Sequence, residues 1–425
     1  MPAHPELIAQ NVQFEKKLHK LTDRVYVAVG YAASNVSFLV GESGVIVIDT
    51  TETTQAAENI LADFRAVCDL PIRTIIYTHS HRDHISGASI FAQGGAVAIY
   101  AADNFASDLV EVDARQPAPN AALMARTKRQ FGISLSDDER VSLGVGPGNR
   151  PMKGMGAGYL PPTHRIGETT KIALEGFDLE LAKAPGETPD HLIVWLAEDG
   201  VLISGDNFYH AFPNLYAIRG TPYRDFDAWA ATMDQLMAYA PEVLVPGHTQ
   251  PIIGAQAIKD VLTDYRDAIR HVITETVNGI NAGLDPRTIA AGLSLPEALA
   301  HKPYLKEFYG HIGYAAQAYF AGTLGWFDGN PTSLGRLPPA AEAERFVALA
   351  GGPEKIAQAA QAALAARDAQ WAMELADRLI ASGADAAGRG IKIAAMRHLA
   401  DQTINAPTRN YYLLSARELE SSAGE

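Results

Sequence analysis

The first part of the chain alternates short apolar runs with turn residues. Three runs rich in β-branched residues lie at positions 25–29, 37–40 and 45–49. The sequence Gly-Glu-Ser-Gly separates the last two, which predicts a hairpin of strands. Apolar residues at helical spacing follow over positions 53–67, and an uninterrupted apolar run follows at 74–77. The pattern therefore predicts a strand, helix and strand unit after the hairpin.

The same kind of pattern returns in the middle of the chain. Apolar runs typical of buried strands lie at positions 192–196, 201–204 and 243–246, and a helical pattern covers 226–239. Two such halves, each with strands and helices, predict an α/β protein with two packed sheets and helices on the outer faces. We therefore expect an αββα sandwich.

Two other regions have a different character. Positions 115–168 are rich in glycine and proline and show little periodicity, and long segments of this kind in compact domains are usually functional. After about position 254 the pattern is almost entirely helical, with helix pairs such as 353–366 and 368–381. We expect a catalytic domain over residues 1–265 and an all-α domain over residues 266–425.

Composition narrows the possible partners of this 425-residue chain. The formal net charge of −14, without a basic block, argues against nucleic acid as a partner. No stretch approaches the roughly 20 apolar residues that span a bilayer, so no membrane partner is expected. The polar N-terminus shows no secretory segment, and Cys68 is the single cysteine, which we expect in the core. These features predict a cytoplasmic protein.

A dense group of metal-binding residue types follows the strand at 74–77. His79, His81, Asp83 and His84 provide imidazole nitrogens and a carboxylate within six residues, and these are ligands that Zn²⁺ accepts. In an extended segment residues i and i+2 point the same way, so His79 and His81 can share one ion. Asp83 and His84 then turn towards a second ion. An isolated histidine at a strand end is usually a packing residue, but four candidate ligands together favour a two-metal site.

Three more candidate ligands lie at the ends of other predicted strands. His191 precedes the run at 192–196, Asp206 follows 201–204, and His248 follows 243–246. Each would be a weak prediction alone, but a sheet brings such ends together, so we expect all three near the first group. A site with an open coordination position would activate water for hydrolysis.

The complete set resembles the metallo-β-lactamase superfamily, whose pattern is His-x-His-x-Asp-His followed by a histidine, an aspartate and a histidine. The resemblance covers residues 25–254. It implies that the first metal is bound by His79, His81 and His191, the second by Asp83, His84 and His248, with Asp206 as the bridge. It also implies that a bridging hydroxide is the nucleophile and that Asp83 orients it as a catalytic residue.

Three segments further resemble the type III alkylsulfatases, which are zinc enzymes: positions 77–87, 206–220 and 324–331. The resemblance implies two Zn²⁺ per subunit, hydrolysis of a small anionic sulfate ester, and a homodimer formed through the helical domain. In that family the Asn and Arg of Asn-Leu-Tyr-x-x-Arg-Gly hold the sulfate, which here are Asn214 and Arg219. A guanidinium and an amide suit a tetrahedral oxyanion. Tyr159, in the glycine-rich segment, is a further candidate for contact with the leaving group.

The chain departs from that family at several places. The family uses glutamates where His191 and Asp206 stand, and its His-Asn pair is Tyr314-Ala315 here. The family's C-terminal sterol-carrier-like domain is not expected, which makes a long-chain detergent a less favoured substrate. Hydrolysis of carboxylic esters, lactones, β-lactams or phosphate esters on the same dinuclear site therefore stays open, as does a catalytically silent helical assembly module.

Overall fold

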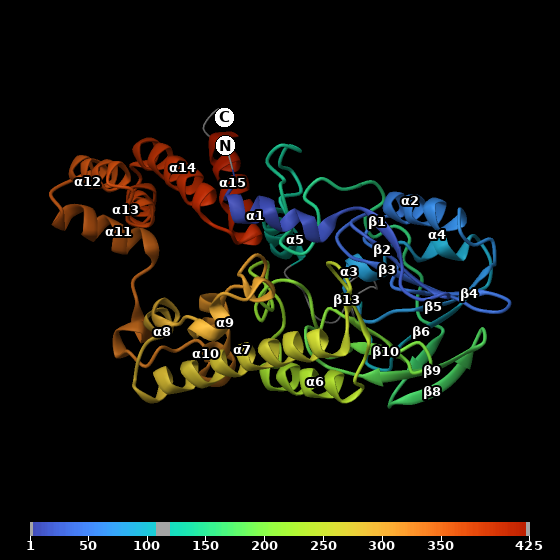
Figure 1. Ribbon diagram of the computed structural model, residues 1–425. Coiled ribbons are helices and arrows are strands. Elements are labelled where there is room, and N and C mark those ends of the chain that lie inside the picture. The colour runs from blue at the N-terminus through green and yellow to red at the C-terminus, as the bar shows by residue number, and fades with distance from the viewer. Residues whose placement is uncertain (1–2, 108–119, 422–425) are drawn as a thin grey trace.

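The computed structural model describes residues 3–107 and 120–421 and contains two β-sheets that face each other (Figure 1). The first sheet has the strands β1 (Lys17–Lys20), β2 (Val25–Val29), β3 (Val36–Val40), β4 (Val45–Ile48), β5 (Ile72–Ile76), β6 (Ala98–Ala102) and β7 (His164–Ile166), in that order. The second has the order β13 (Ile252–Ile253), β12 (Val243–Pro246), β11 (Val201–Gly205), β10 (Leu192–Leu196), β9 (Phe177–Lys183) and β8 (Thr170–Leu174). The predicted strands are thus all present, with small shifts at their ends.

Side chains point alternately to the two faces of each strand, and this explains why the sheets form layers. In β4, Ile46 and Ile48 face the core between the two sheets, whereas Val45 and Val47 face the core beneath the helices α2 (Thr54–Arg65) and α4 (Ala88–Ala92). Side chains of neighbouring residues on a strand point to opposite faces, so a strand buried on both faces is apolar throughout. The helices α6 (Phe226–Ala238) and α7 (Ala255–Asn281) cover the outer face of the second sheet. The expected αββα sandwich is confirmed.

The part of the chain after α7 is helical, as expected. It consists of α8 (Pro286–Gly292), α9 (Glu297–Ala300), α10 (Ile312–Leu324), α11 (Pro339–Leu349), α12 (Pro353–Ala365), α13 (Ala369–Ala381), α14 (Asp385–Gln402) and α15 (Ala406–Ser421), with short 3₁₀ turns at Pro303–Leu305 and Pro331–Gly335. The boundary that we predict between residues 265 and 266 falls inside α7, so the division into domains stays a prediction. Among the described residues, no helix is long and apolar enough to cross a membrane.

The glycine-rich segment is held in place by contacts with other parts of the chain. Its described portion begins with the helix α5 (Asn120–Gln130), while residues 115–119 lie outside the described residues. The C-terminal helix α15 packs beside α5 (Figure 1), and Leu135 joins Leu413 and Leu414 in a small apolar cluster. At the other end of the chain, α1 (Pro5–Ala9) and the 3₁₀ turn Gln10–Phe14 precede β1, and Gln10 donates a hydrogen bond to the Gly144 carbonyl.

Candidate metal centre

The candidate ligands gather where strands of both sheets end. The His79 to His84 segment follows β5 and passes into the short helix α3 (Arg82–Ile85), while Asp206 and His248 follow the neighbouring parallel strands β11 and β12. Glycines allow this close approach. A Cβ on Gly247 would lie 2.1 Å from Asp206 Oδ1, and one on Gly205 would lie 2.3 Å from His191 Cε1. Any side chain at these two positions would therefore displace a candidate ligand.

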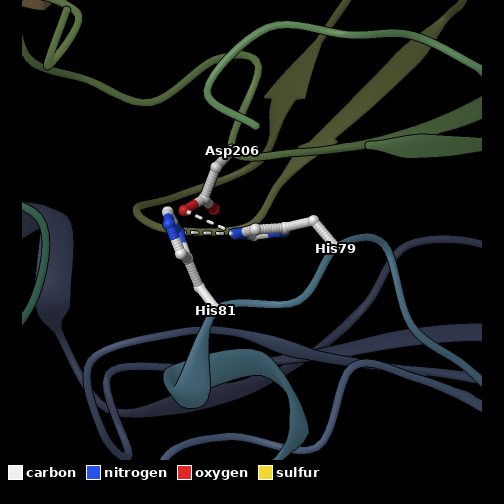
Figure 2. Close-up of side chains that lie close together, drawn as sticks. All are labelled: His79, His81 and Asp206. Carbon is white, nitrogen blue, oxygen red and sulfur yellow. Dashed lines mark hydrogen bonds and ion pairs between the residues drawn. The ribbon is translucent and has the colours of Figure 1, made fainter. Parts of the chain in front are cut away.

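The first cluster consists of His79, His81 and Asp206. Figure 2 shows the three side chains converging from two different loops. His79 Nε2 lies 3.0 Å from His81 Nδ1 and 3.6 Å from Asp206 Oδ2. His79 and Asp206 are buried, whereas His81 is partly exposed, so the cluster opens towards solvent at His81.

The second cluster consists of Asp83, His84 and His248. Asp83 Oδ2 lies 3.6 Å from His84 Nε2 and 3.5 Å from His248 Nε2. Asp206 Oδ2 reaches into this cluster too, 3.3 Å from His84 Nε2 and 3.1 Å from His248 Nε2. One carboxylate therefore contacts histidines of both clusters.

These distances fit two metal ions. Ligand atoms about 2.0–2.1 Å from a tetrahedral Zn²⁺ lie about 3.3 Å apart. Four donor-atom pairs in the two clusters are 3.0–3.6 Å apart, and within each cluster all donor atoms lie within 4.8 Å of one another. Two of the buried donor atoms, His84 Nε2 and Asp206 Oδ1, have no hydrogen-bond partner among the described residues. Buried polar atoms normally have a partner, so these two atoms are consistent with a ligand at this place.

The electrostatics of the two clusters differ. Burial lowers the pKa of His79 and His81 well below the usual histidine value, which leaves their imidazoles neutral. For His84 and His248 burial acts in the same direction, but the carboxylates of Asp206 and Asp83 outweigh it and raise the pKa, to about 9 for His248. Neutral imidazole is the metal-binding form, so metal binding at the second cluster has to release protons.

Asp49 supports the second cluster and was missed by the sequence analysis. It lies directly after β4, and its Oδ2 is 2.7 Å from His84 Nδ1. The same carboxylate accepts hydrogen bonds from the backbone N–H and the hydroxyl of Thr78, each at 2.8 Å. A carboxylate on the far nitrogen of a metal-binding histidine fixes its tautomer and ring orientation. Asp49 lies at the end of a predicted strand, as Asp206 does, so the same reasoning from strand ends also identifies Asp49 as a candidate.

Replacement of Asp49 by alanine is expected to weaken metal binding at the second cluster by about 10–100-fold, because His84 loses the group that orients its ring. Competition for Zn²⁺ against a coloured chelator would measure the change. Asp69→Ala is a suitable control, since Asp69 is exposed. Equal zinc affinity in Asp49→Ala and the wild type would show that Asp49 does not hold His84 in its binding orientation.

His191 lies beside the first cluster, but its ring nitrogens are engaged elsewhere. The ring stacks on His79 with centroids 4.6 Å apart, and Nε2 accepts a hydrogen bond of 3.0 Å from the backbone N–H of Asp206. Nδ1 lies 3.2 Å from the carbonyl oxygen of Leu192. The structure thus places His191 at the predicted position, while the ring orientation required of a ligand is not seen.

Glu187 and Arg224 form a buried ion pair next to the first cluster, and neither was predicted. Glu187 Oε1 lies 2.7 Å from Arg224 Nη1 and 3.9 Å from His81 Nδ1. Burial raises the pKa of Glu187 to about 7 although Arg224 opposes the shift. Its Oε2 is buried and has no hydrogen-bond partner among the described residues. Glu187 is therefore a further candidate ligand beside His81.

The predicted anion-binding residues lie on the loop that follows β11. Asn214 is buried, and its Nδ2 has no hydrogen-bond partner within the described part of the chain. Arg219 is partly exposed, and its Nη1 donates a hydrogen bond of 3.1 Å to the Gly220 carbonyl. The charges of Arg219 and Arg224 add to burial in lowering the pKa of His81. Tyr159 instead packs against Tyr77, with ring centroids 6.3 Å apart, and its contact with a leaving group stays a prediction.

Sequence profiles of two known families match the chain. The profile of the metallo-beta-lactamase superfamily matches residues 29–248, which include both metal clusters, and the alkyl sulfatase dimerisation profile matches residues 285–422. The two matches divide the chain between the sandwich and the helical region that follows it.

Curated relatives and a solved structure give the same assignment. A linear primary-alkylsulfatase from Pseudomonas sp. is 36% identical over 89% of this chain and 72% of its own length. The alkyl/aryl-sulfatase BDS1 from Saccharomyces cerevisiae is 30% identical over 95% of this chain and 64% of its own length. The stereoselective inverting sec-alkylsulfatase Pisa1 from Pseudomonas sp. superposes with a TM-score of 0.88 at 28% identity, over 99% of this chain and 68% of Pisa1. The chain therefore belongs to the metallo-beta-lactamase superfamily, among the alkylsulfatase homologues that combine this fold with an alkyl sulfatase dimerisation region.

Proposed function

We propose that this protein is a dinuclear zinc hydrolase of sulfate esters. The observation that carries the proposal is the pair of clusters that share Asp206, with the Glu187–Arg224 pair beside His81 and the charge of Arg219 acting on His81. Such an arrangement would combine a metal site with the positive charge of Arg219 where an anionic ester binds, whereas the charge of Arg224 is paired with Glu187. The relatives at 29–36% identity, all of them named as alkylsulfatases or alkyl/aryl-sulfatases, support sulfate as the anionic group.

We propose that the two metal ions would be Zn²⁺ and that His79, His81, Asp83, His84, His191, Asp206 and His248 would hold them, with Asp206 as the shared ligand. Two bound Zn²⁺ ions would generate a nucleophile from water near neutral pH and draw negative charge from the ester. His191 would have to exchange its hydrogen bond with the Asp206 N–H for the metal. Glu187 needs no such exchange, because its Oε2 is already free of hydrogen bonds among the described residues.

The protein's own groups would bind and orient the substrate. Arg219 would donate hydrogen bonds to the sulfate oxygens, and Asn214 would add its Nδ2, which has no partner among the described residues. The carboxylate of Asp83 lies between His84 and His248 at the partly exposed side of the site. Asp83 would therefore accept a hydrogen bond from the attacking water and direct this water to the ester. Tyr159 is kept as a candidate for contact with the leaving group.

A substrate panel tests the proposal. The zinc-loaded protein should release sulfate from short alkyl sulfates faster than it hydrolyses matched phosphate esters, carboxylic esters, lactones or a β-lactam, and a chelator should abolish the reaction. Preferential hydrolysis of one of the other classes would replace the assignment by that class. A protein that hydrolyses none of them with metal bound would contradict an enzymatic role.

We also propose that the protein is a homodimer formed through the helical region. Apolar side chains are exposed there, notably Trp326 and Leu334 with 75% and 67% of their surface accessible. Both residues lie inside the region that matches the alkyl sulfatase dimerisation profile. A second copy of the chain would cover these side chains and remove their apolar surface from water.

The variant Trp326→Asp is expected to shift the protein from dimer to monomer, because it places a charge in the apolar contact. Light scattering after size exclusion would measure the mass. Val67→Asp is a matched control, since Val67 is also an exposed apolar residue but lies just after α2. A monomeric wild type, or a Trp326→Asp protein that remains dimeric, would contradict the proposed interface.

The proposed compartment is the cytoplasm. The single cysteine, Cys68, which we expect in the core, is half-buried and packs against the core beneath α2. With one cysteine the chain needs no oxidising compartment for an internal disulfide. Fractionation of cells that express the full protein would test the location.

A further inference from the structure

The helix α5 lies against the loop that carries Arg219. Gly220 has φ +107°, and a Cβ at this position would lie 3.0 Å from Leu123 Cδ2 and 3.9 Å from Arg126 Nη1. Leu123, Arg126 and Gln130 are separated by three and four residues, so they share one face of α5. This face of α5 therefore covers the backbone at Arg219 and Gly220.

Gln130 makes the direct contact between α5 and Arg219. It is the buried residue of this otherwise exposed or half-buried helix, with 1% of its surface accessible. Its Oε1 accepts a hydrogen bond of 2.8 Å from the backbone N–H of Arg219. A backbone N–H can only donate, so the amide oxygen has to face Arg219 and the amide Nε2 has to point elsewhere.

The amide Nε2 of Gln130 is buried and has no hydrogen-bond partner among the described residues. The Nδ2 of Asn214, on the same loop as Arg219, is also buried and has no hydrogen-bond partner among the described residues. A buried donor without a partner costs free energy, so an acceptor that reached both the Gln130 and the Asn214 amides would satisfy two such donors at once. An oxyanion offers several acceptor oxygens at once.

The C-terminal helix holds Gln130 in this place. Asn410 Nδ2 donates to the backbone carbonyl of Gln130 at 3.3 Å and lies 3.5 Å from the carbonyl of Ser142. Arg417, also on α15, donates to the carbonyl of Ser134 at 3.1 Å. Hydrogen bonds from α15 thus anchor the backbone at Gln130 and just after it.

We propose that Gln130 is a substrate-binding residue: it orients Arg219 through Oε1 and donates Nε2–H to the anionic group of the ester, together with Asn214 and Arg219. The proposal rests on the proposed function of the site as one that binds an anionic ester. It adds a residue from the glycine-rich segment, and it makes selectivity for anionic over neutral esters depend on α5.

The variant Gln130→Glu separates the two roles, because it keeps an acceptor for the Arg219 N–H but replaces the donor by a negatively charged oxygen. The zinc-loaded wild type and variant would be titrated with inorganic sulfate, and KM and kcat would be measured for an alkyl sulfate and a neutral ester. Gln130→Ala removes both roles. Gln358→Glu, at an exposed position of α12, is the control for the added charge.

We expect Gln130→Glu to raise the Kd for sulfate and the KM for the alkyl sulfate by at least 10-fold, with kcat and the neutral ester affected less than threefold. Gln130→Ala should show a smaller increase in the same two quantities. Equal sulfate affinity in Gln130→Glu and the wild type, or no affinity in either, would overturn the role of Gln130. Failure of the wild type to hydrolyse the alkyl sulfate would instead overturn the proposed function, so the two failures are distinguishable. Equal thermal unfolding temperatures would confirm that the variants are folded.

Discussion

The variant Asp206→Ala is expected to lose both metal ions and to lower kcat/KM by about 10³-fold or more. Asp206 Oδ2 lies within 3.1–3.6 Å of His79, His84 and His248, so one substitution removes the carboxylate that both clusters share. Without it, the two histidines whose pKa is raised by carboxylates, His84 and His248, lose their main partner. The ligand atoms of the two clusters would no longer be held together.

Metal content by mass spectrometry of the purified variant, together with steady-state kinetics, would measure this effect. Asp178→Ala is the matched control, because Asp178 is an exposed aspartate on β9 in the same sheet as β11. We expect two metal ions per chain in the control and less than about half of one in Asp206→Ala. A variant that keeps two ions would show that Asp206 is not the shared ligand.

The variant Arg219→Ala is expected to lower kcat/KM for a sulfate ester by about 10–100-fold, because a charge-assisted hydrogen bond to an anion contributes about 1.5–3 kcal/mol. Most of the change should appear in KM, since the guanidinium binds the sulfate group before and during the reaction. Hydrolysis of a neutral ester by the same variant should change little. The ratio of the two activities is therefore the quantity to compare.

Arg73→Ala provides the control for Arg219→Ala. Arg73 lies at the beginning of β5, at the opposite end from the histidine segment, and its side chain is largely exposed. We expect both substrates to be hydrolysed normally by this control. An equal loss for sulfate and neutral esters in Arg219→Ala would indicate a structural role of Arg219 and would contradict anion binding.

The sequence predicted well those features that depend on short stretches of chain. The four candidate ligands His79, His81, Asp83 and His84 could be identified without tertiary information, because they lie within six residues of the sequence. Asp206 and His248 were found because the ends of neighbouring strands meet, and β11 and β12 are indeed parallel neighbours. The strand β9 was missed although Phe177, Leu179 and Leu181 alternate with polar or small residues and are buried.

Features that depend on side-chain orientation, or on contacts between residues far apart in the sequence, could not be predicted from the sequence pattern. The position of His191 at a strand end was correct, but its ring orientation depends on the backbone N–H of Asp206, which no local pattern reveals. Glu187 and Arg224 are 37 residues apart in sequence and meet only in the folded protein. The contact between Gln130 and Arg219 spans 89 residues and needs α15 to hold α5 in place.

Two metal ions on the clusters joined by Asp206 are proposed to catalyse hydrolysis of a sulfate ester. The most direct test is to remove all metal from the protein and to titrate it with Zn²⁺ while sulfate release from an alkyl sulfate is measured. We predict no release without metal and a rate that rises until about two Zn²⁺ per chain are bound. Sulfate release by the metal-free protein, or full activity at one ion per chain, would show that the reaction does not depend on two metal ions.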